Sequence, residues 1–516
     1  MSLAFSSEEF GFAFGSSKSS THQKPTDETP FCIAILADFG GRGNRGLCET
    51  GESLAGRRRI MVDVDNIENL PARLGVQLHI PIGSGGEVKM QFKELDDFHP
   101  DRIFDQLELL QELKAIRNRL QNPATFTEAA GQLQSWITGK PDADKPQAPK
   151  ADDVSARFQE TNDDMLARLL EKQPGQQPST SPGLFPSVEA FIRQAVEPYI
   201  VPAPDPRQGD LVSQVDQALS SQMRAILHHP DFQRLESAWR TLHFLVSHVE
   251  TDETLKLYVI DITKAELAAD LSSNELQSTG TYRLLVEQSV GTPGAWPWAL
   301  LLGDYVFDQS EEDVALLRKL AGVAQAAGSP FLATASGHFA GCESLAAASD
   351  PDDWQWHGHP DLVRQWREFR QSPQSAFIGL ALPRFLLRLP YGKNTEPIDQ
   401  FEFEELTDVP DHNRYLWGNP AAICTYLLAA AFRECGWSLA DGLRCDVTGL
   451  PMHVYKTGDQ TNVTPCVEIF LTERAMQILI DKGLIPLLSF KGRDTVRVAR
   501  FQSIAEPPTP LAGRWW

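Results

Sequence analysis

A glycine-rich loop gives the sequence its most enzyme-like signal. Gly41, Gly43 and Gly46 are spaced as GxGxxG after an apolar stretch, and Asp63 and Asp65 follow later in the chain. A dinucleotide-binding fingerprint has this order, with backbone N–H groups holding the pyrophosphate and an acid about 20 residues on binding the ribose. The pattern therefore predicts, as one alternative, a cytoplasmic nucleotide-binding enzyme.

The residues after this loop weaken that interpretation. A phosphate-binding loop should open a helix whose N-terminus meets the phosphate. Residues 47–59 contain Gly51 and Gly56, and glycine disfavours helix. We therefore favour a glycine-rich surface loop with exposed arginines.

A second group of residues has the types that bind metals. His357 and His359 stand in an HxH pair near Asp350, Asp352 and Asp353. Two imidazoles at this spacing can approach one ion, but a site needs a third ligand at a telling spacing, which the sequence does not offer. The cysteines have no zinc spacing either. We expect no metal, no cofactor and no catalytic residue.

Arg384 and Arg388 form a third group with the acidic run that contains Glu402, Glu404 and Glu405. On a helical turn, two arginines four residues apart would share one face. A catalytic constellation is conceivable, but ion pairs inside the protein or between subunits are the simpler interpretation. Arg384 and Arg388 are therefore candidate interaction residues.

Composition excludes several classes of protein. The 516-residue chain has 47 Lys and Arg against 69 Asp and Glu, for a net charge of −22. Nucleic-acid binders need a basic face, so we expect no nucleic-acid partner. We find no apolar run near the roughly 18–20 residues of a membrane helix, so we expect no membrane insertion. Seven cysteines without CxxC indicate reduced thiols and, with no signal sequence, a cytoplasmic protein.

The pattern of strands and helices predicts two domains of the α/β (α+β) class. A small α+β domain over 31–137 has apolar strands followed by a helix with one apolar stripe over 96–120. A larger layered α/β domain over 210–500 alternates strands and helices. In it, Asn419 and Gly436 should cap a buried helix.

A flexible linker should join the domains over 138–209. It contains a short amphipathic helix whose apolar face would be Met165, Leu166, Leu169 and Leu170. Such a helix between unstructured flanks suits capture by a partner's groove, and folding back onto its own chain is the alternative.

Both ends of the chain read as tails. In the tail over 1–30, Phe10, Phe12 and Phe14 alternate with other residues, as in a short strand that would need an external edge to pair with. A disordered tail is the alternative. The tail over 501–516 carries prolines that oppose strand pairing. Its final Trp515 and Trp516 could dock in a partner's pocket.

Several motifs, in order, resemble the contractile sheath proteins of bacterial type VI secretion. DDFHPD and the strands before it resemble the small (TssB/VipA-like) subunit. Between about 211 and 495 the chain is similar to the large (TssC/VipB-like) subunit in the motifs ILHHPDFQRLESAWRTLHFLV, LLGDYVF, SPFLATAS, LPRFLLRLPYG, YLWGN and ERAMQILIDKGLIPLLSFKGRD.

This resemblance implies a structural function. Sheath subunits assemble around an inner tube and contract to drive effector delivery, linked by strands donated between protomers. The implied partners are other protomers, the inner-tube protein, baseplate components and the AAA+ unfoldase, which would bind near 162–171. The family usually has separate chains and a longer large subunit. The fusion and the shorter C-terminal part leave open a specialised cap or a baseplate-proximal adaptor.

Overall fold

The computed structural model describes residues 25–82, 86–122, 125–138, 208–273, 275–355, 359–407 and 411–515. Helices and strands alternate through these ranges, so the predicted α/β class is confirmed. No described helix has the length and apolar character needed to cross a membrane. The N-terminal phenylalanines and the predicted linker helix lie outside the described residues.

A nine-stranded sheet runs through the described part of the molecule in the order β11–β15–β14–β8–β7–β6–β1–β5–β2. The strands from β14 to β5 are parallel to their neighbours, and β2, β15 and β11 are antiparallel. The strands are β1 (Phe31–Ala37), β2 (Ile60–Val62), β5 (Leu255–Asp261), β6 (Trp298–Phe307), β7 (Phe331–Ala335), β8 (Ile378–Leu382), β11 (Asp446–Val447), β14 (Ile485–Ser489) and β15 (Val496–Val498).

Strand β1 comes first in the chain but lies in the interior of this sheet. Phe31 stands opposite Leu255 of β5, and Cys32 stands opposite Trp298 of β6. All seven β1 residues are buried. A strand covered on both faces reads as a continuous apolar run, which explains why the sequence FCIAILA shows no alternation. Residues on the two sides of the predicted linker therefore share one sheet.

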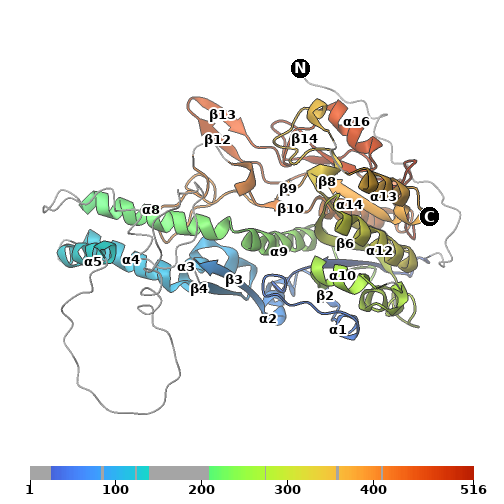
Figure 1. Ribbon diagram of the computed structural model, residues 1–516, viewed down its shortest axis with the longest axis horizontal. Coiled ribbons are helices and arrows are strands. Elements are labelled where there is room, and N and C mark those ends of the chain that lie inside the picture. Colours follow the sequence, from blue (N-terminus) through green and yellow to red (C-terminus); the bar gives the residue numbers. More distant parts are fainter. Residues whose placement is uncertain are drawn as a thin grey trace, which may run out of the picture.

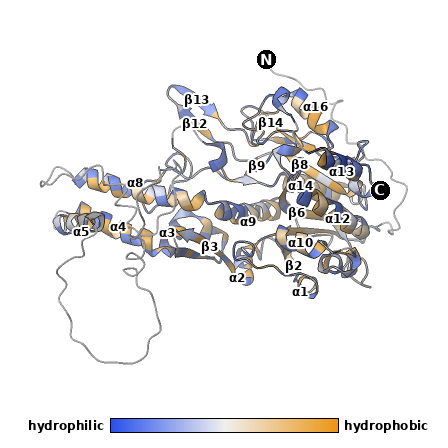
Figure 2. Ribbon diagram, viewed as in Figure 1, coloured by the Kyte–Doolittle hydropathy of each residue, from blue (hydrophilic) through white to orange (hydrophobic). Residues whose placement is uncertain are grey.

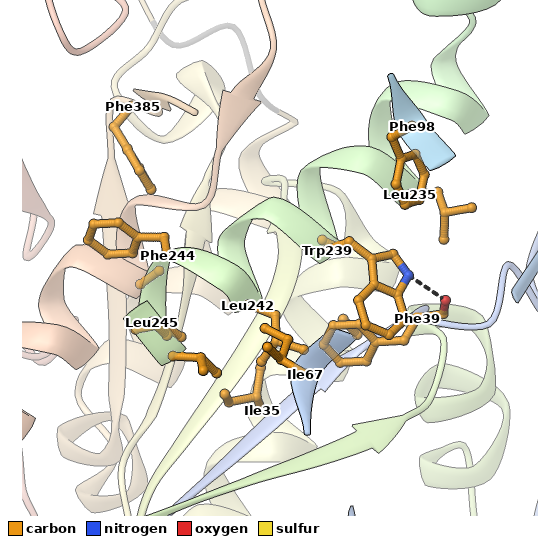
Figure 3. Close-up of a cluster of buried hydrophobic side chains, with 14 of the residues drawn as sticks. Ile35, Phe39, Ile67, Phe98, Leu235, Trp239, Leu242, Phe244, Leu245 and Phe385 are labelled. Carbon is orange, nitrogen blue, oxygen red and sulfur yellow. Dashed lines mark hydrogen bonds between the residues drawn. The ribbon is translucent and has the colours of Figure 1, made fainter. Parts of the chain in front are cut away.

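Helices α9 (Pro230–His248) and α14 (Pro420–Cys435) pack in the core on one face of the sheet. Ile35 of β1 lies in a cluster with Trp239 and Leu242 of α9 (Figure 3). The Trp239 Nε1–H donates to the backbone oxygen of Phe39 at 2.9 Å. A residue of each predicted domain thus takes part in this bond.

Helices α10 (Lys264–Leu271) and α12 (Glu311–Ala327) pack in the core on the other face. Alternate β1 residues point to this side, as the period of two requires. Cys32, Ala34 and Leu36 belong to this second core cluster. The sheet is therefore a middle layer between two helical layers.

Helix α14 confirms the prediction made from its ends. The Asn419 side chain accepts a hydrogen bond from the Ala421 N–H, Pro420 takes the first helical position, and Gly436 ends the helix with φ of 58°. Eleven of its residues are buried, because the helix packs on β6, β7 and β8 of the sheet and against α9.

Three helices extend from the sheet as an arm (Figure 1). They are α4 (Glu108–Gln121), α5 (Phe126–Thr138) and α8 (Gln208–Leu227), and they show mixed hydropathy along their length (Figure 2). The single helix predicted over 96–120 is wrong in one respect. Leu107 takes an extended conformation and separates α4 from α3 (Pro100–Gln106).

The remaining elements are short. Three two-stranded sheets pair β3 (Val76–Ile82) with β4 (Gly86–Phe92), β9 (Phe385–Leu386) with β10 (Trp417–Gly418), and β12 (Val454–Thr457) with β13 (Gln460–Val463). The other α-helices are α1 (Glu52–Ala55), α2 (Leu70–Leu74), α11 (Gly280–Tyr282), α13 (Pro360–Arg370), α15 (Leu439–Gly442) and α16 (Glu473–Asp481).

The C-terminal segment packs against the body of the protein. Residues 501–515 contain no regular strand, as their prolines predict. The backbone N–H of Ile504 nevertheless donates to Ile378, and that of Ala512 donates to Ala376. Leu511 is 1% exposed and lies in the core.

Candidate interaction sites

Arg388 is the centre of a buried group of charged side chains. Its Nε–H donates to Glu236 at 2.8 Å and its Nη1–H to Glu405 at 2.7 Å, and Nη2 makes a second contact with each carboxylate. Arg240 adds a bond to Glu236 at 2.7 Å. All three residues of the two forked pairs are nearly inaccessible, with 6% of Arg388 exposed. Two positive charges therefore balance two negative charges in the core.

Tyr391 completes this group. The Arg388 guanidinium lies 4.2 Å from the centre of its ring, and Arg240 donates to its hydroxyl at 3.0 Å. The Tyr391 backbone N–H donates to Glu405 at 2.8 Å. The same carboxylate thus fixes both the arginine and the backbone that follows it.

The directions of the pKa shifts favour an ionised Arg388–Glu405 pair at neutral pH. Burial acts to raise the pKa of Glu405, but the charge of Arg388 opposes it and lowers this pKa to about 2. Burial acts to lower the pKa of Arg388, while Glu236 and Glu405 raise it well above its usual value. Burial also raises the pKa of Tyr391, so the phenol stays neutral.

This charged group lies where residues of the first predicted domain meet those of the second. The His99 ring packs edge-on against the Tyr391 ring at 5.0 Å. Asp101 accepts hydrogen bonds from the backbone N–H groups of Asp399 and Gln400, each at 3.1 Å. We call the group of Glu236, Arg240, Arg388, Tyr391 and Glu405, with these contacts, the charged joint.

Arg384 lies in a different environment. Its Nε–H donates to Glu468 at 2.9 Å and its backbone N–H donates to the other carboxylate oxygen at 2.8 Å. His412 is 3.1 Å from the same carboxylate. Burial acts to raise the pKa of Glu468, but His412 and Arg384 lower it to about 2. The Arg384 side chain remains 39% exposed.

The structure brings together only part of the predicted arginine–glutamate group. Arg388 pairs with Glu405, whereas the Glu404 carboxylate accepts from the Lys393 N–H and Glu402 is exposed. The two arginines do not share a helical face, because Phe385 and Leu386 between them form strand β9.

The glycine-rich loop uses its own carboxylates where a phosphate would bind. The Asp38 carboxylate accepts from the N–H groups of Arg42 at 2.6 Å and Gly43 at 2.9 Å, and Asp261 accepts from Gly40 at 2.9 Å. The next helix, α1, has four residues and starts at Glu52. This geometry supports the surface-loop interpretation over a dinucleotide fingerprint.

The structure describes only one residue of the HxH pair. His359 accepts a hydrogen bond from the Asp361 N–H and caps α13, while His357 lies outside the described residues. His99 and His229 cap α3 and α9 in the same way, each followed by proline and aspartate. The described residues contain no group of three or more potential metal ligands.

Trp515, predicted to be free for docking, is a core residue instead. Only 7% of it is exposed, and its ring stacks on Phe31 of β1 with the centroids 6.4 Å apart. The C-terminal segment is bonded to the body of the protein at Ile504 and Ala512, which brings this ring into the core. The paired Trp516 lies outside the described residues, as do the other predicted interaction residues, namely Phe10, Phe12, Phe14, Met165, Leu166, Leu169 and Leu170.

Sequence reasoning missed Glu236, Arg240, Tyr391, Glu468 and His412. One local signal was present, because Glu236 and Arg240 stand four residues apart on a helix and form an ion pair there. The other pairs join residues that are distant in the chain, such as Arg388 and Glu236, 152 positions apart.

Comparisons with known proteins match two segments of the chain to two different families. A family model of VipB, described as a tail sheath N-terminal domain, matches residues 209–505, more than half of the chain. A family model of VipA of the type VI secretion system matches residues 17–138. The two matches fall on either side of the predicted linker.

A curated relative matches more than half of the chain. The type VI secretion system sheath protein TssC1 of Pseudomonas aeruginosa is 38% identical over 304 residues, which are 58% of this chain and 61% of that protein. This chain therefore spans about three fifths of the length of the relative it matches. The chain belongs to the VipB family of type VI secretion tail sheath proteins, and it carries a VipA-type segment fused ahead of the VipB-type segment.

Proposed function

We propose that this chain is a fused protomer of the contractile tail sheath of type VI secretion, which assembles in the cytoplasm with copies of itself around an inner tube. The single observation that carries the proposal is the composite sheet, in which β1 of the VipA-type segment lies between β5 and β6 of the VipB-type segment. One chain thereby supplies both halves of a sheath unit.

The two outer strands of this sheet offer places for neighbouring protomers. Strand β2 forms one edge and β11 the other. On β2, Met61 is 48% exposed, and Val64 just beyond the strand is 65% exposed. An apolar side chain on an open edge favours pairing with an added strand. We propose that the alternating Phe10, Phe12 and Phe14 of another copy supply that strand.

The further partners belong to the same proposal. They are the inner-tube protein, which the sheath would enclose, the baseplate, and an AAA+ unfoldase that would bind the helix at 162–171. Assembly in an extended state would store free energy as strain between protomers, and contraction would release it, so the function requires no covalent chemistry. The sheath protein TssC1 supports this non-enzymatic interpretation.

Electron microscopy of the purified chain tests the proposal. We expect the micrographs to show hollow tubes when the chain is expressed together with the inner-tube protein. Met61→Lys should abolish them, because a charge on the β2 edge prevents strand addition. Val363→Lys is the matched control, since Val363 is a 37% exposed valine on α13, away from both edges, and its tubes should persist.

Other outcomes would redirect the proposal. Small closed rings or monomers in every condition would contradict a polymerising protomer and favour a cap or a baseplate-proximal adaptor. Saturable dinucleotide binding that Gly43→Asp abolishes would favour the enzyme alternative. The Asp38 contacts to the glycine-rich loop argue against that second result.

A further inference from the structure

A cavity of about 880 Å³ opens at the carboxyl ends of the central parallel strands. Its lining includes Asp38 after β1, Thr263 after β5, Asp304 near the end of β6 and Thr334 in β7. Trp417 of β10 is among the other lining residues. In open α/β sheets the crevice beyond the carboxyl ends is the usual place for a ligand. The proposed sheath function assigns no role to this cavity.

Strand β6 departs from regular pairing where it borders the cavity. Leu302 pairs with Leu332 of β7, and Val306 pairs with Thr334, so three residues of β6 stand opposite one residue of β7. Asp304 is the middle residue of this bulge. Bulges are common next to binding sites, where they turn a side chain out of the ladder.

Asn419 holds this bulge in place. Its Nδ2–H donates to the backbone oxygen of Gly303, the residue before Asp304, at 2.9 Å. A side chain at Gly303 would meet the Phe331 ring at 2.3 Å, so glycine is required here. Two distant segments thus cooperate to direct one carboxylate toward the cavity.

The charges around the cavity leave this carboxylate without a cation. Each lining cation has its own carboxylate: Arg234 pairs with Asp231, Lys264 with Asp313 and Arg384 with Glu468. Within the described part of the chain, no arginine, lysine or histidine nitrogen lies within 4.0 Å of the Asp304 carboxylate. Burial raises the pKa of Asp304 to about 6, although the bond from Asn419 acts to lower it. A bound cation would stabilise its ionised form.

An apolar surface adjoins the carboxylate. Val306 stands two residues beyond Asp304 in β6 and is 52% exposed, which is unusual for a valine in a central strand. Leu316 and Ala268 add apolar atoms, and Trp417 adds an indole ring. Aromatic rings attract organic cations, and aliphatic stems pack on apolar side chains.

We propose that this cavity binds the guanidinium or ammonium head of an arginine-like or lysine-like ligand, with the head on Asp304 and the aliphatic stem on Val306. The source is either a side chain of another polypeptide or a free small amine, because the two share this chemistry. The proposal is independent of tube assembly, and a monomeric protein would show the binding equally well.

Isothermal titration calorimetry on the full chain tests the proposal with defined probes. N-acetyl-arginine amide and N-acetyl-lysine amide represent side chains, agmatine represents a free amine, and N-acetyl-citrulline amide is the neutral match of the arginine probe. We expect saturable binding of at least one charged probe and no measurable binding of the citrulline probe. Tighter binding of the amides than of agmatine would identify the ligand as a side chain of another polypeptide. Tighter binding of agmatine would identify it as a free amine.

Two variants place the binding at this cavity. Asp304→Asn should weaken binding at least tenfold, whereas Asp481→Asn, an exposed carboxylate on α16, should leave it unchanged. If Asp304→Asn does not fold, Val306→Lys is the test variant, because Val306 is exposed. A lysine at this position would occupy the cavity itself and should prevent binding of the probes. No saturable binding by the wild-type chain at millimolar concentrations would overturn the proposal. Equal binding of the citrulline probe, or unchanged binding in both variants, would overturn it as well.

Discussion

Two of the places where the VipA-type and VipB-type segments meet have opposite character. At the first, strand β1 lies between β5 and β6 with apolar side chains on both faces, and we call this the apolar joint. At the second, the charged joint, α3 contacts the polar network around Arg388. Burial of apolar area holds the segments together at the first joint. At the second, the ion pairs lie within the VipB-type segment, and the His99–Tyr391 ring contact and the Asp101 hydrogen bonds link it to α3.

The energies support this division. Complete burial of one large aliphatic side chain contributes about 1.5–3 kcal/mol, and β1 buries four large side chains. Buried ion pairs lose most of their attraction to desolvation, so they contribute little net stability but become costly when one partner is removed. The apolar joint should therefore be sensitive to any polar substitution, and the charged joint to any unbalanced charge.

The largest expected effect is at the apolar joint. Ile35→Asp places a carboxylate at a position that is 1% exposed, where no partner satisfies it, and should cost more than about 5 kcal/mol. We expect no folded protein, as measured by soluble yield and near-ultraviolet circular dichroism. Met61→Asp, on the exposed edge strand β2, should change stability by about 0.5 kcal/mol or less. A folded Ile35→Asp protein would contradict the interior position of β1.

The next effect is at the charged joint. Arg388→Met leaves Glu236 and Glu405 buried without their shared cation, and should destabilise by about 3–5 kcal/mol. Chemical denaturation measures this change. Arg364→Met is the matched control, because its pair with Asp361 is exposed and should contribute about 0–1 kcal/mol. Equal effects of the two variants would mean that the buried network is not intact in solution.

The contributions of the two joints to stability should differ in their dependence on pH. The pKa of Glu405 is lowered from its usual 4.5 to about 2, so its ionised form contributes stability that is present above pH 4.5 and lost as the pH falls toward 2. Melting temperature should therefore fall through this window. Ile35→Val removes only apolar area, so its loss of stability should be the same at every pH. Arg388→Met should show a flatter acid dependence than the wild-type chain, and a parallel curve would refute the assignment.

The smallest effect concerns the rim of the charged joint. Asp101→Ala removes the acceptor of the Asp399 and Gln400 N–H groups, and should cost about 1–2 kcal/mol in a denaturation experiment. Asp105→Ala on the same helix changes an exposed carboxylate and should have no measurable effect. Identical results for both variants would show that α3 is not held by these bonds.

Local structure was predictable from sequence because its causes are local. Asn419, Pro420 and Gly436 define both ends of α14, and the structure has those ends. The tripeptide His-Pro-Asp at 99, 229 and 359 starts a helix each time, with the histidine accepting from the aspartate N–H. Capping depends on residues within one turn, so the same letters give the same geometry.

The partners of these elements were not predictable. The run at 31–37 indicated a buried strand, but nothing in it specifies β5 and β6, more than 200 residues away, as its neighbours. Arg388 was a candidate, and Glu405 in the nearby acidic run was found with it, whereas Glu236 lies on a distant helix. Nothing in the sequence indicates the bulge in β6, where three residues stand opposite one residue of β7. The bulge depends on two residues distant in the chain, the ring of Phe331 and Asn419.

One measurement tests directly whether the two segments form a single folding unit. A protease site inserted between 139 and 207 allows the folded chain to be cut where the two segments are linked. We predict that the two fragments remain together in size-exclusion chromatography and separate only in denaturant, in one transition, because β1 stays between β5 and β6. Fragments that separate in native buffer, each with its own unfolding transition, would contradict the composite sheet.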